Sequence, residues 1–228
     1  MPRPAGAGAS PSWPGARRCC GWGALAEKAT LEFGAQLTGV TLSTEQLAWA
    51  RQRLAAQGVG DKADLRLQDY RDIDDGPYDA ICSIEMLEAV GHEYWPTYFQ
   101  SVARLLKPGG RACIQSIVIR DDLFERYIRS TDFIQQYIFP GGCLPCPTEF
   151  RKAAREAGLV VDDELPFGRD YAETLRRWRD AFLAQRSRVL ALGFDERFVR
   201  TWEFYLAYCE AAFAESSIDV VQYTLVRS

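Results

Sequence analysis

A glycine turn followed by a strand that ends in hydroxyl groups constrains the fold of this chain more than any other feature. Residues 20–23 read CGWG and open a stretch of helical spacing, and residues 39–46 read GVTLSTEQ. The first segment predicts a turn before a helix, and the second predicts a short strand that leads into another helix. Because the carboxyl ends of parallel strands meet at one edge of a sheet, the two segments together indicate a ligand-binding edge of an α/β fold.

Segments with strand and helix patterns alternate along much of the chain. The sequence KPGG at residues 107–110 predicts a turn, Ser43-x-x-Gln46 predicts a capping box, and the aromatic-rich residues 171–214 predict a helical region. We expect strands over residues 35–41, 64–67, 78–84, 111–119, 159–165 and 218–226, and helices over residues 24–33, 43–57, 97–106 and 149–157. This alternation predicts a doubly wound, mostly parallel sheet with an antiparallel C-terminal strand and a helical cap.

The segment before the glycine turn lacks the pattern of a strand. Residues 1–16 are rich in Pro, Gly, Ala and Ser and carry no apolar run of the kind found in signal peptides, which indicates disorder. Residues 14–19 read PGARRC where a first strand is expected. We therefore expect residues 1–18 to be disordered or non-native, and residues 19–228 to form one domain whose first strand is missing.

Composition argues against several classes of protein. The formal net charge of -4 argues against a nucleic-acid binder, and no apolar run reaches the length of a transmembrane segment. The 7 cysteines follow no repeating spacing, which favours a reduced, cytoplasmic setting over a disulfide framework. Cys143 and Cys146 have redox or metal spacing, but they lack a second CxxC pair, so we expect no metal site.

The glycine turn and the next two strand ends can be interpreted in more than one way. Gly21 and Gly23 let a backbone pass close to a ligand, although helix starts also carry glycine for structural reasons alone. The dinucleotide fingerprint GxGxxG is absent and no acidic residue ends the strand at residues 37–41, which argues against NAD. Asp69 and Tyr70 after the third strand could clamp an adenine or form a solvated turn.

Two carboxylates, Glu85 and Glu88, follow a buried strand. Carboxylates in such a place cost desolvation energy, which a functional site would explain. Helix capping is the structural alternative, and it suits Glu85 better than Glu88. His92 fits an exposed turn better than a general base, and Gln115 could contact a ligand or make structural hydrogen bonds. Tyr171 and the aromatic residues after it indicate a packed core, with an acyl-chain tunnel as the alternative.

Taken together, these segments resemble the family of cyclopropane-fatty-acyl-phospholipid synthases and mycolic acid cyclopropane synthases, which are S-adenosylmethionine-dependent methyltransferases. The resemblance extends from about residue 20 to the C-terminus. It rests on CGWG, GVTLSTEQ, YDAICSIEMLEAVGHEYW, LLKPGG, YIFPGGCLP, FGRDYAETLRRW and IDVVQYTLVRS, in that order. It implies a Rossmann-like class I S-adenosylmethionine-dependent methyltransferase sheet. Because nothing here corresponds to the family's N-terminal helices, we expect a chain that is truncated or disrupted at its N-terminus.

The same resemblance implies two ligands, S-adenosylmethionine as the methyl donor and bicarbonate as the general base. The implied cofactor-binding residues are Cys20, Gly21, Trp22, Gly23, Thr41, Leu42, Ser43, Gln46, Asp69 and Tyr70. The implied catalytic residues around bicarbonate are Glu88, Tyr171, Gln115, which stands where some members have His, and Ile117 through its backbone.

The implied reaction is the transfer of a methylene or methyl group to the double bond of an unsaturated acyl chain of a phospholipid. The alternatives are a methyl-branching or other small-molecule methyltransferase, and a non-catalytic remnant. The implied partners are phospholipid acyl chains at the inner membrane surface, with a peripheral, cytoplasmic location, and a homodimer is left open.

Overall fold

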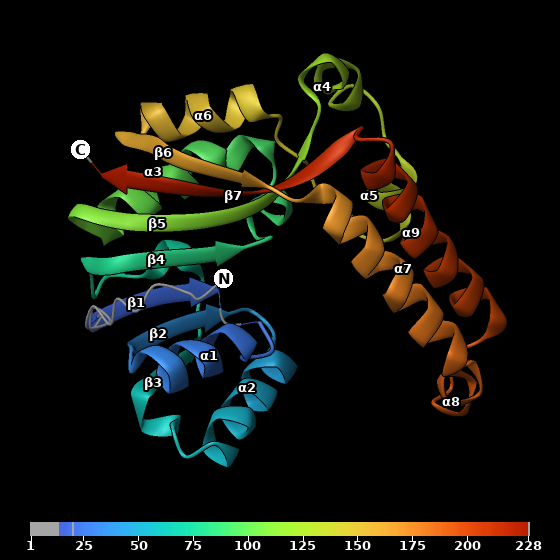
Figure 1. The fold of residues 1–228 in the computed structure, drawn as a ribbon, viewed down its shortest axis with the longest axis horizontal. Helices are drawn as coiled ribbons and strands as arrows, with labels where there is room; N and C mark the ends of the chain where they lie inside the picture. Colours follow the sequence, from blue (N-terminus) through green and yellow to red (C-terminus); the bar gives the residue numbers. More distant parts are fainter. Residues whose placement is uncertain (1–13, 20, 228) are drawn as a thin grey trace, which may run out of the picture.

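A sheet of seven strands, in the order β3-β2-β1-β4-β5-β7-β6, forms the centre of the part of the chain that the structure describes (Figure 1). The structure is a computed structural model and describes residues 14–19 and 21–227. The strands are β1 (Pro14–Cys19), β2 (Gln36–Thr41), β3 (Ala63–Leu67), β4 (Tyr78–Ile84), β5 (Leu106–Ile119), β6 (Leu159–Pro166) and β7 (Ile218–Arg227). β1 to β5 pair in parallel, and β7 runs antiparallel to both of its neighbours. The predicted fold class, including the antiparallel C-terminal strand, is confirmed.

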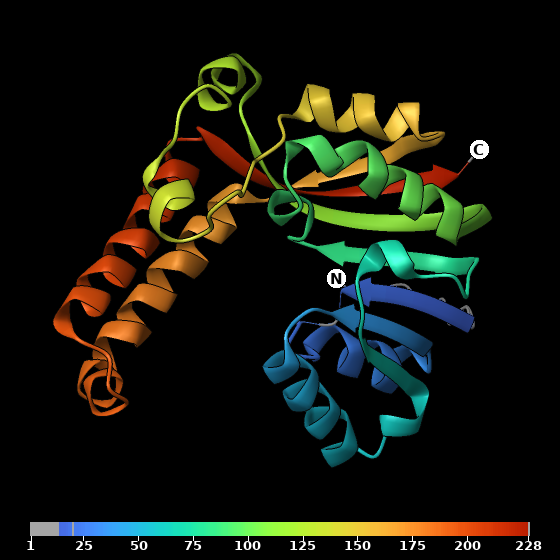
Figure 2. The same cartoon turned by 180° about the vertical axis from the view of Figure 1, so that it is seen from behind.

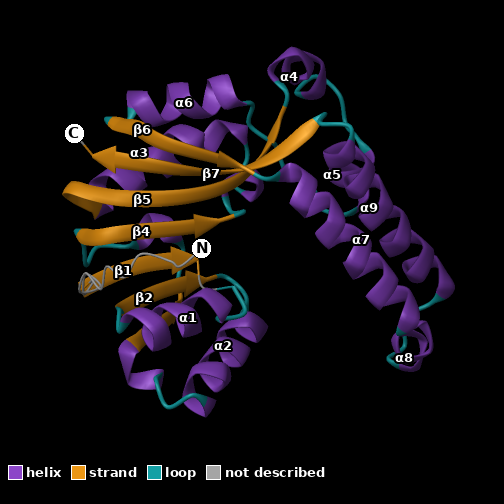
Figure 3. Cartoon of the chain, in the orientation of Figure 1, coloured by secondary structure: helices purple, strands orange, loops and turns teal. Residues whose placement is uncertain are grey.

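Helices cover both faces of this sheet (Figures 2 and 3). The α-helices are α1 (Ala24–Phe33), α2 (Thr44–Ala56), α3 (Trp95–Leu105), α4 (Asp121–Tyr127), α5 (Phe133–Tyr137), α6 (Pro147–Glu156), α7 (Gly168–Ala184), α8 (Arg186–Ala191) and α9 (Glu196–Ala214). Single 3-10 turns are η1 (Gly60–Lys62), η2 (Tyr70–Asp72), η3 (Leu87–Ala89) and η4 (His92–Tyr94). The predicted helical region after residue 170 is thus a pair of long helices with a short one between them.

Apolar cores on both faces hold the helices on the sheet, and a further cluster packs α7 and α9 against β7. α1 and α2 bury small side chains against β2 and β3, among them Ala29 and Ala50. α3 and α6 lie on the opposite face, where Phe150 stacks on Tyr223 of β7 with ring centroids 3.9 Å apart. Phe99 of α3 meets Phe150 edge-on at 5.1 Å. Removing this much aromatic area from water stabilises the β5–β7 half of the sheet.

The expectation that the first strand is missing was wrong. Pro14–Cys19 forms β1 at the middle of the sheet, paired with β2 on one side and with β4 on the other. A central strand is held by backbone hydrogen bonds to both neighbours, so tertiary context overrides the weak strand propensity of PGARRC. Proline is tolerated here because it is the first residue of the strand. The expectation of disorder for residues 1–13 lies outside the described residues.

A helical arm extends from the carboxyl end of the sheet (Figure 1). α7 and α9 pack side by side with α8 at their tip, and α5 lies against the base of the arm. The arrowheads of β1, β2 and β4 point toward the side on which the arm lies. Since the strand order reverses direction between β1 and β4, this edge is the place where open α/β sheets bind ligands.

The predicted turn at residues 107–110 belongs to β5 in the structure. Leu106 pairs with Tyr78 and Arg111 with Ala80, so the residues between them leave the regular register. Gly109 has a φ of 73°, a left-handed conformation that glycine adopts without strain. The turn signal was therefore read correctly, but it produces an irregularity inside a strand and not a connection before it.

Candidate active site

The two glycines of the turn after β1 differ in their surroundings: one is packed against a helix and the other faces open space. Gly23 caps α1 with a φ of 82°, and a Cβ placed on it would lie 2.9 Å from the Cβ of Ala50. Gly21 has a φ of 44°, and a Cβ placed on it would meet nothing within 4 Å. Gly23 is therefore required for α1 to approach α2, whereas Gly21 leaves its backbone accessible. Trp22 is 54% exposed beside them, and Cys20 lies outside the described residues.

The end of β2 is held by internal hydrogen bonds. The Thr41 hydroxyl donates to Oε1 of Gln46 at 2.8 Å, and Ser43 N–H donates to Oγ1 of Thr41 at 3.1 Å. Ser43 Oγ accepts from Gln46 N–H at 3.1 Å and so caps α2. The predicted capping box is only half formed, because the Gln46 side chain binds Thr41 and not the backbone of Ser43. Leu42, between them, is 75% exposed at the open edge.

Asp69 and Tyr70 follow β3 at the same edge. The Asp69 carboxylate caps η2 and accepts from the Arg71 backbone at 2.9 Å and from its guanidinium at 2.8 Å. These hydrogen bonds lower the pKa of Asp69. Tyr70 packs edge-on against Tyr98 of α3 with ring centroids 5.9 Å apart. The turn therefore presents a fixed, ionised carboxylate next to an anchored aromatic ring.

Glu85, the first residue after β4, is the hub of the polar groups at this edge. Its Oε1 accepts from Nε2 of Gln115 at 2.7 Å, and its Oε2 accepts from the Tyr171 hydroxyl at 2.8 Å. Oε1 of Gln115 in turn accepts from Nε2 of Gln222 on β7 at 3.0 Å, which fixes the direction of the Gln115 amide. Burial and the Glu85 charge raise the pKa of Tyr171, so the phenol stays protonated as a donor. Glu85 thus joins β4, β5 and α7.

The backbone of Glu85 is also unusual. Its φ is 50°, a left-handed conformation that costs a residue with a Cβ about 1–2 kcal/mol. Its N–H donates to the carbonyl of Gln115 at 2.8 Å, which holds the residue in this conformation. The interpretation of Glu85 as the better candidate for a helix cap was wrong, because its carboxylate binds Gln115 and Tyr171 and caps no helix.

Glu88 lies on η3 beside Glu85. Its Oε1 accepts from the backbone N–H of Ile117, and its Oε2 is shut off from solvent. Burial raises the pKa of Glu88 to about 7; the charge of Glu85 adds to the increase, and hydrogen bonds from backbone N–H groups oppose it. Near neutral pH the protonated and ionised forms of this carboxyl are therefore both populated.

The implied catalytic residues are brought together by the fold. Two of them, Gln115 and Tyr171, bind the Glu85 carboxylate, and the Ile117 backbone binds Glu88. These residues come from three separate elements, η3, β5 and α7. The implied cofactor-binding residues form a second group along the ends of β1, β2 and β3. Sequence reasoning missed Glu85 as the hub and missed Gln222 entirely. The spacing of the two acids in SIEMLE was the available signal for Glu85.

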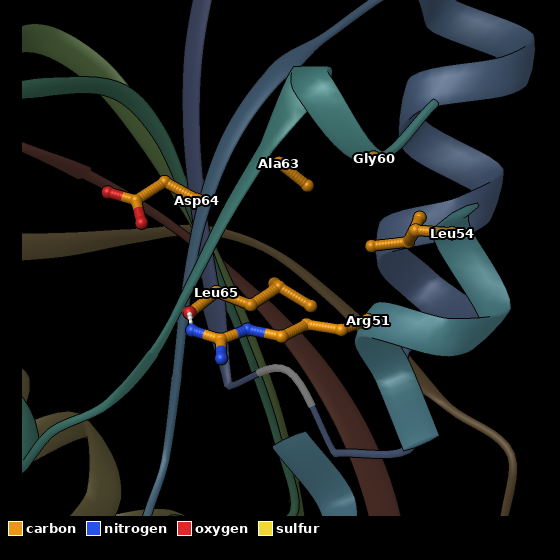
Figure 4. Close-up of a pocket in the computed structure, with 6 residues that line it drawn as sticks. All are labelled: Arg51, Leu54, Gly60, Ala63, Asp64 and Leu65. Atoms are coloured by element: carbon orange, nitrogen blue, oxygen red, sulfur yellow. Dashed lines mark hydrogen bonds between the residues drawn. The ribbon is translucent and has the colours of Figure 1, made fainter. Parts of the chain in front are cut away.

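A cavity of about 250 Å³ lies elsewhere, between α2 and the first half of β3 (Figure 4). Arg51 crosses it and donates to the carbonyl of Leu65 at 2.7 Å. Ala63, at the start of β3, and Gly60 line its other side. Because it does not reach the carboxyl ends of the strands, this cavity is separate from both groups of site residues.

The CxxC cysteines sit in a closed environment. Burial raises the pKa of both the Cys143 and the Cys146 thiol to about 11, so neither is a thiolate at neutral pH. Among the side chains that the structure describes, those of residues 21–227, no group of three or more His, Cys, Asp or Glu is placed to hold a metal ion. In the same residues, none of the helices combines the length and the apolar character needed to cross a bilayer.

Comparison with known proteins identifies the relatives of this chain. Residues 18–223 match the family described as mycolic acid cyclopropane synthetase. Tuberculostearic acid methyltransferase UfaA1 of Mycobacterium tuberculosis is 45% identical over 208 residues, which cover 91% of this chain and 48% of the relative. Cyclopropane-fatty-acyl-phospholipid synthase of Escherichia coli is 36% identical over 208 residues, which cover 91% of this chain and 52% of the relative. The chain therefore spans about half the length of these curated relatives.

A solved structure agrees in fold. The mycolic acid cyclopropane synthase CmaA1, complexed with SAH and CTAB, aligns with a TM-score of 0.86 at 29% identity. The alignment covers 96% of this chain and 79% of that one. This similarity confirms the class I S-adenosylmethionine-dependent methyltransferase fold inferred from the sequence.

Proposed function

Because this chain belongs to the mycolic acid cyclopropane synthetase family, we propose that it transfers the methyl carbon of S-adenosylmethionine to the double bond of an unsaturated acyl chain. The proposed substrate is a phospholipid at the cytoplasmic surface of a membrane, and the proposed product carries a cyclopropane ring. The observation that carries the proposal is the partly buried carboxylate pair Glu85–Glu88 at the sheet edge, beside an arm rich in aromatic side chains.

The residues at the ends of β1, β2 and β3 fit the methyl donor. Gly21 leaves its backbone open to a ligand, as a Cβ there would meet nothing within 4 Å. Asp69 offers an ionised carboxylate for ribose or adenine groups, and Tyr70 offers a ring beside it. S-adenosylmethionine, when bound, supplies an electrophilic methyl group on a positively charged sulfur. The carboxylates after β4 lie at the same edge and would stabilise that charge.

The arm fits the acyl chain. Phe133 of α5 meets Phe204 of α9 at 4.7 Å, and Phe139 meets Tyr205 at 6.1 Å. Phe204 remains 51% exposed, so its ring can still contact an apolar ligand. Aromatic faces also stabilise a cationic carbon, which forms when an alkene takes up a methyl group. We therefore place the acyl double bond between the arm and the Glu85–Glu88 pair.

A second candidate product is a branched acyl group. It is favoured by the 45% identity to a relative named for tuberculostearic acid, against 36% for the relative named as a cyclopropane synthase. Both products begin with the same methyl transfer and differ in which proton leaves afterwards. The same residues would serve either outcome, so the product is decided by the position of the base relative to the cation.

The test is to incubate the 228-residue chain with [methyl-13C]S-adenosylmethionine and vesicles of a mono-unsaturated phospholipid. We expect the label in the acyl chain, as a strongly shielded cyclopropane carbon in the 13C spectrum. A vinylic or methyl-branch resonance would favour the second candidate. Label that stays in the donor or reaches only water-soluble products would contradict lipid alkylation altogether.

A further inference from the structure

The groups that would hold bicarbonate are already bound to side chains of this protein. The resemblance implied Gln115, Tyr171 and the Ile117 backbone as its donors. Nε2 of Gln115 and the Tyr171 hydroxyl donate to Glu85, at 2.7 and 2.8 Å, and Ile117 N–H donates to Glu88. A bicarbonate ion would have to displace these bonds, so the residues present do not fit it.

The charge of the carboxylates at this place also argues against a bound bicarbonate ion. Among residues 21–227, whose side chains the structure describes, no ion pair involves Glu85 or Glu88. The Glu85 charge contributes to the raised pKa values of the Tyr171 and Tyr205 phenols and of the Glu88 carboxyl. A further anion in this partly buried place would be repelled by carboxylates that described cations do not neutralise.

A carboxylate presents the same acceptor as bicarbonate: two oxygens that share one negative charge on a planar carbon. We propose that the Glu85 carboxylate occupies the place assigned to bicarbonate and is itself the general base of the reaction. This inference rests on the proposed methyl transfer. The positive φ of Glu85, 50°, is consistent with it, because a strained backbone at a strand end is a common feature of functional sites.

The proposed step balances without another reactant. After methyl transfer the lipid has a cationic carbon next to the carbon that bears the new methyl group. One C–H bond of that methyl breaks, its electron pair closes the ring onto the cationic carbon, and the proton goes to a Glu85 oxygen. Glu85 becomes a neutral carboxylic acid and returns its proton to solvent when the products leave. If a C–H bond elsewhere in the acyl group breaks instead, the same base leaves a branched alkene.

The first test determines whether Glu85 accepts the proton. Glu85→Gln keeps the size of the side chain but removes its basicity, and we expect turnover to fall by about 100-fold or more. Binding of S-adenosylhomocysteine, measured by calorimetry, should stay within about threefold of wild type. Glu93→Gln, an exposed carboxylate on the neighbouring turn η4, is the matched control and should keep its turnover. Full turnover in Glu85→Gln would overturn the proposal.

The second test needs no activity. Line width in the 13C spectrum of [13C]bicarbonate reports its binding, and we expect no broadening by the wild-type protein. Glu85→Gly frees the donors and the space, so it should broaden the line, and adding Tyr171→Phe should abolish the effect. Broadening by wild type that Tyr171→Phe removes would overturn the proposal. Absence of lipid labelling with these spectra unchanged would count against the methyl transfer and leave the Glu85 placement standing.

Discussion

The Tyr171 hydroxyl lies 2.8 Å from Oε2 of Glu85, although the two residues are 86 positions apart in the sequence. Tyr171 stands on α7 at the base of the arm, and Glu85 directly follows β4 in the middle of the sheet. The hydrogen bond therefore ties the part of the molecule that we assign to the acyl chain to the part that we assign to the methyl donor. Its strength should affect turnover more than folding.

Tyr171→Phe tests this connection. The substitution keeps the ring, which packs on Phe213 at 4.9 Å, and removes only the donor to Glu85. Losing a hydrogen bond to a charged group costs about 1.5–3 kcal/mol, so we expect kcat to fall by roughly 10- to 100-fold. S-adenosylhomocysteine affinity should not change. Tyr137→Phe, at a residue that is 64% exposed, is the control. Equal losses of kcat and of affinity would place Tyr171 in the donor site.

Gly21 and Gly23 form a matched pair for the glycine turn. Gly23→Ala brings a Cβ within 2.9 Å of Ala50, in addition to its left-handed backbone. We expect it to lower the free energy of unfolding by roughly 2–4 kcal/mol in urea denaturation. Gly21→Ala meets open space and should cost only about 1 kcal/mol from its backbone. If Gly21→Ala proved the more destabilising of the two, the placement of this turn against α2 would be wrong.

Glu88 makes stability depend on pH. Its pKa is raised from 4.5 to about 7 in the folded protein, so the native state binds more protons than the unfolded state between these values. Stability therefore falls as the pH rises through this window, by roughly 3 kcal/mol. Glu88→Gln does not titrate, so its stability relative to wild type should increase from pH 5 to pH 8. A difference that stays flat over this range would contradict the burial of the charge.

Ser216 offers a substitution that should stabilise the fold. It follows α9 with a φ of 55°, and its N–H donates to the carbonyl of Phe213 at 3.1 Å. Ser216→Gly relieves the left-handed strain, and we expect a gain of about 0.5–1 kcal/mol in thermal unfolding. Ser187→Gly, at an exposed position within α8, should instead destabilise by about 0.5–1 kcal/mol. Opposite signs for these two serines are the expected result.

Much of the fold could be predicted because local patterns coincide with the elements. The alternating strand at residues 78–84 and the helix before Gly34 have the bounds that the sequence indicated. β1 could not be predicted, because PGARRC has little strand propensity and its place depends on β2 and β4. A pairing between distant segments leaves no trace in the local sequence.

The site divides in the same way. The sequence placed Thr41 and the two glutamates at or after strand ends, and the structure has them there, because the end of a parallel strand marks the binding edge whatever its side chains do. Their roles came from the family resemblance and stay predictions. The partners of Glu85 were not found. Gln115 and Tyr171 are 30 and 86 positions away, and only the packing of α7 against β7 brings the tyrosine to the carboxylate. Gln222 donates a hydrogen bond to Gln115 and does not contact Glu85 in any hydrogen bond given above, so no sequence motif indicated it.

The binding of S-adenosylhomocysteine to the 228-residue protein, followed by titration calorimetry, tests the placement of the methyl donor most directly. We predict one binding site that Gly21→Leu and Asp69→Ala weaken by about tenfold or more, equivalent to about 1.4 kcal/mol. Arg51→Ala, which alters only the separate cavity of Figure 4, should leave the affinity unchanged. Absence of binding, or binding that depends on Arg51 and not on Gly21 and Asp69, would contradict a donor site at the carboxyl edge of the sheet.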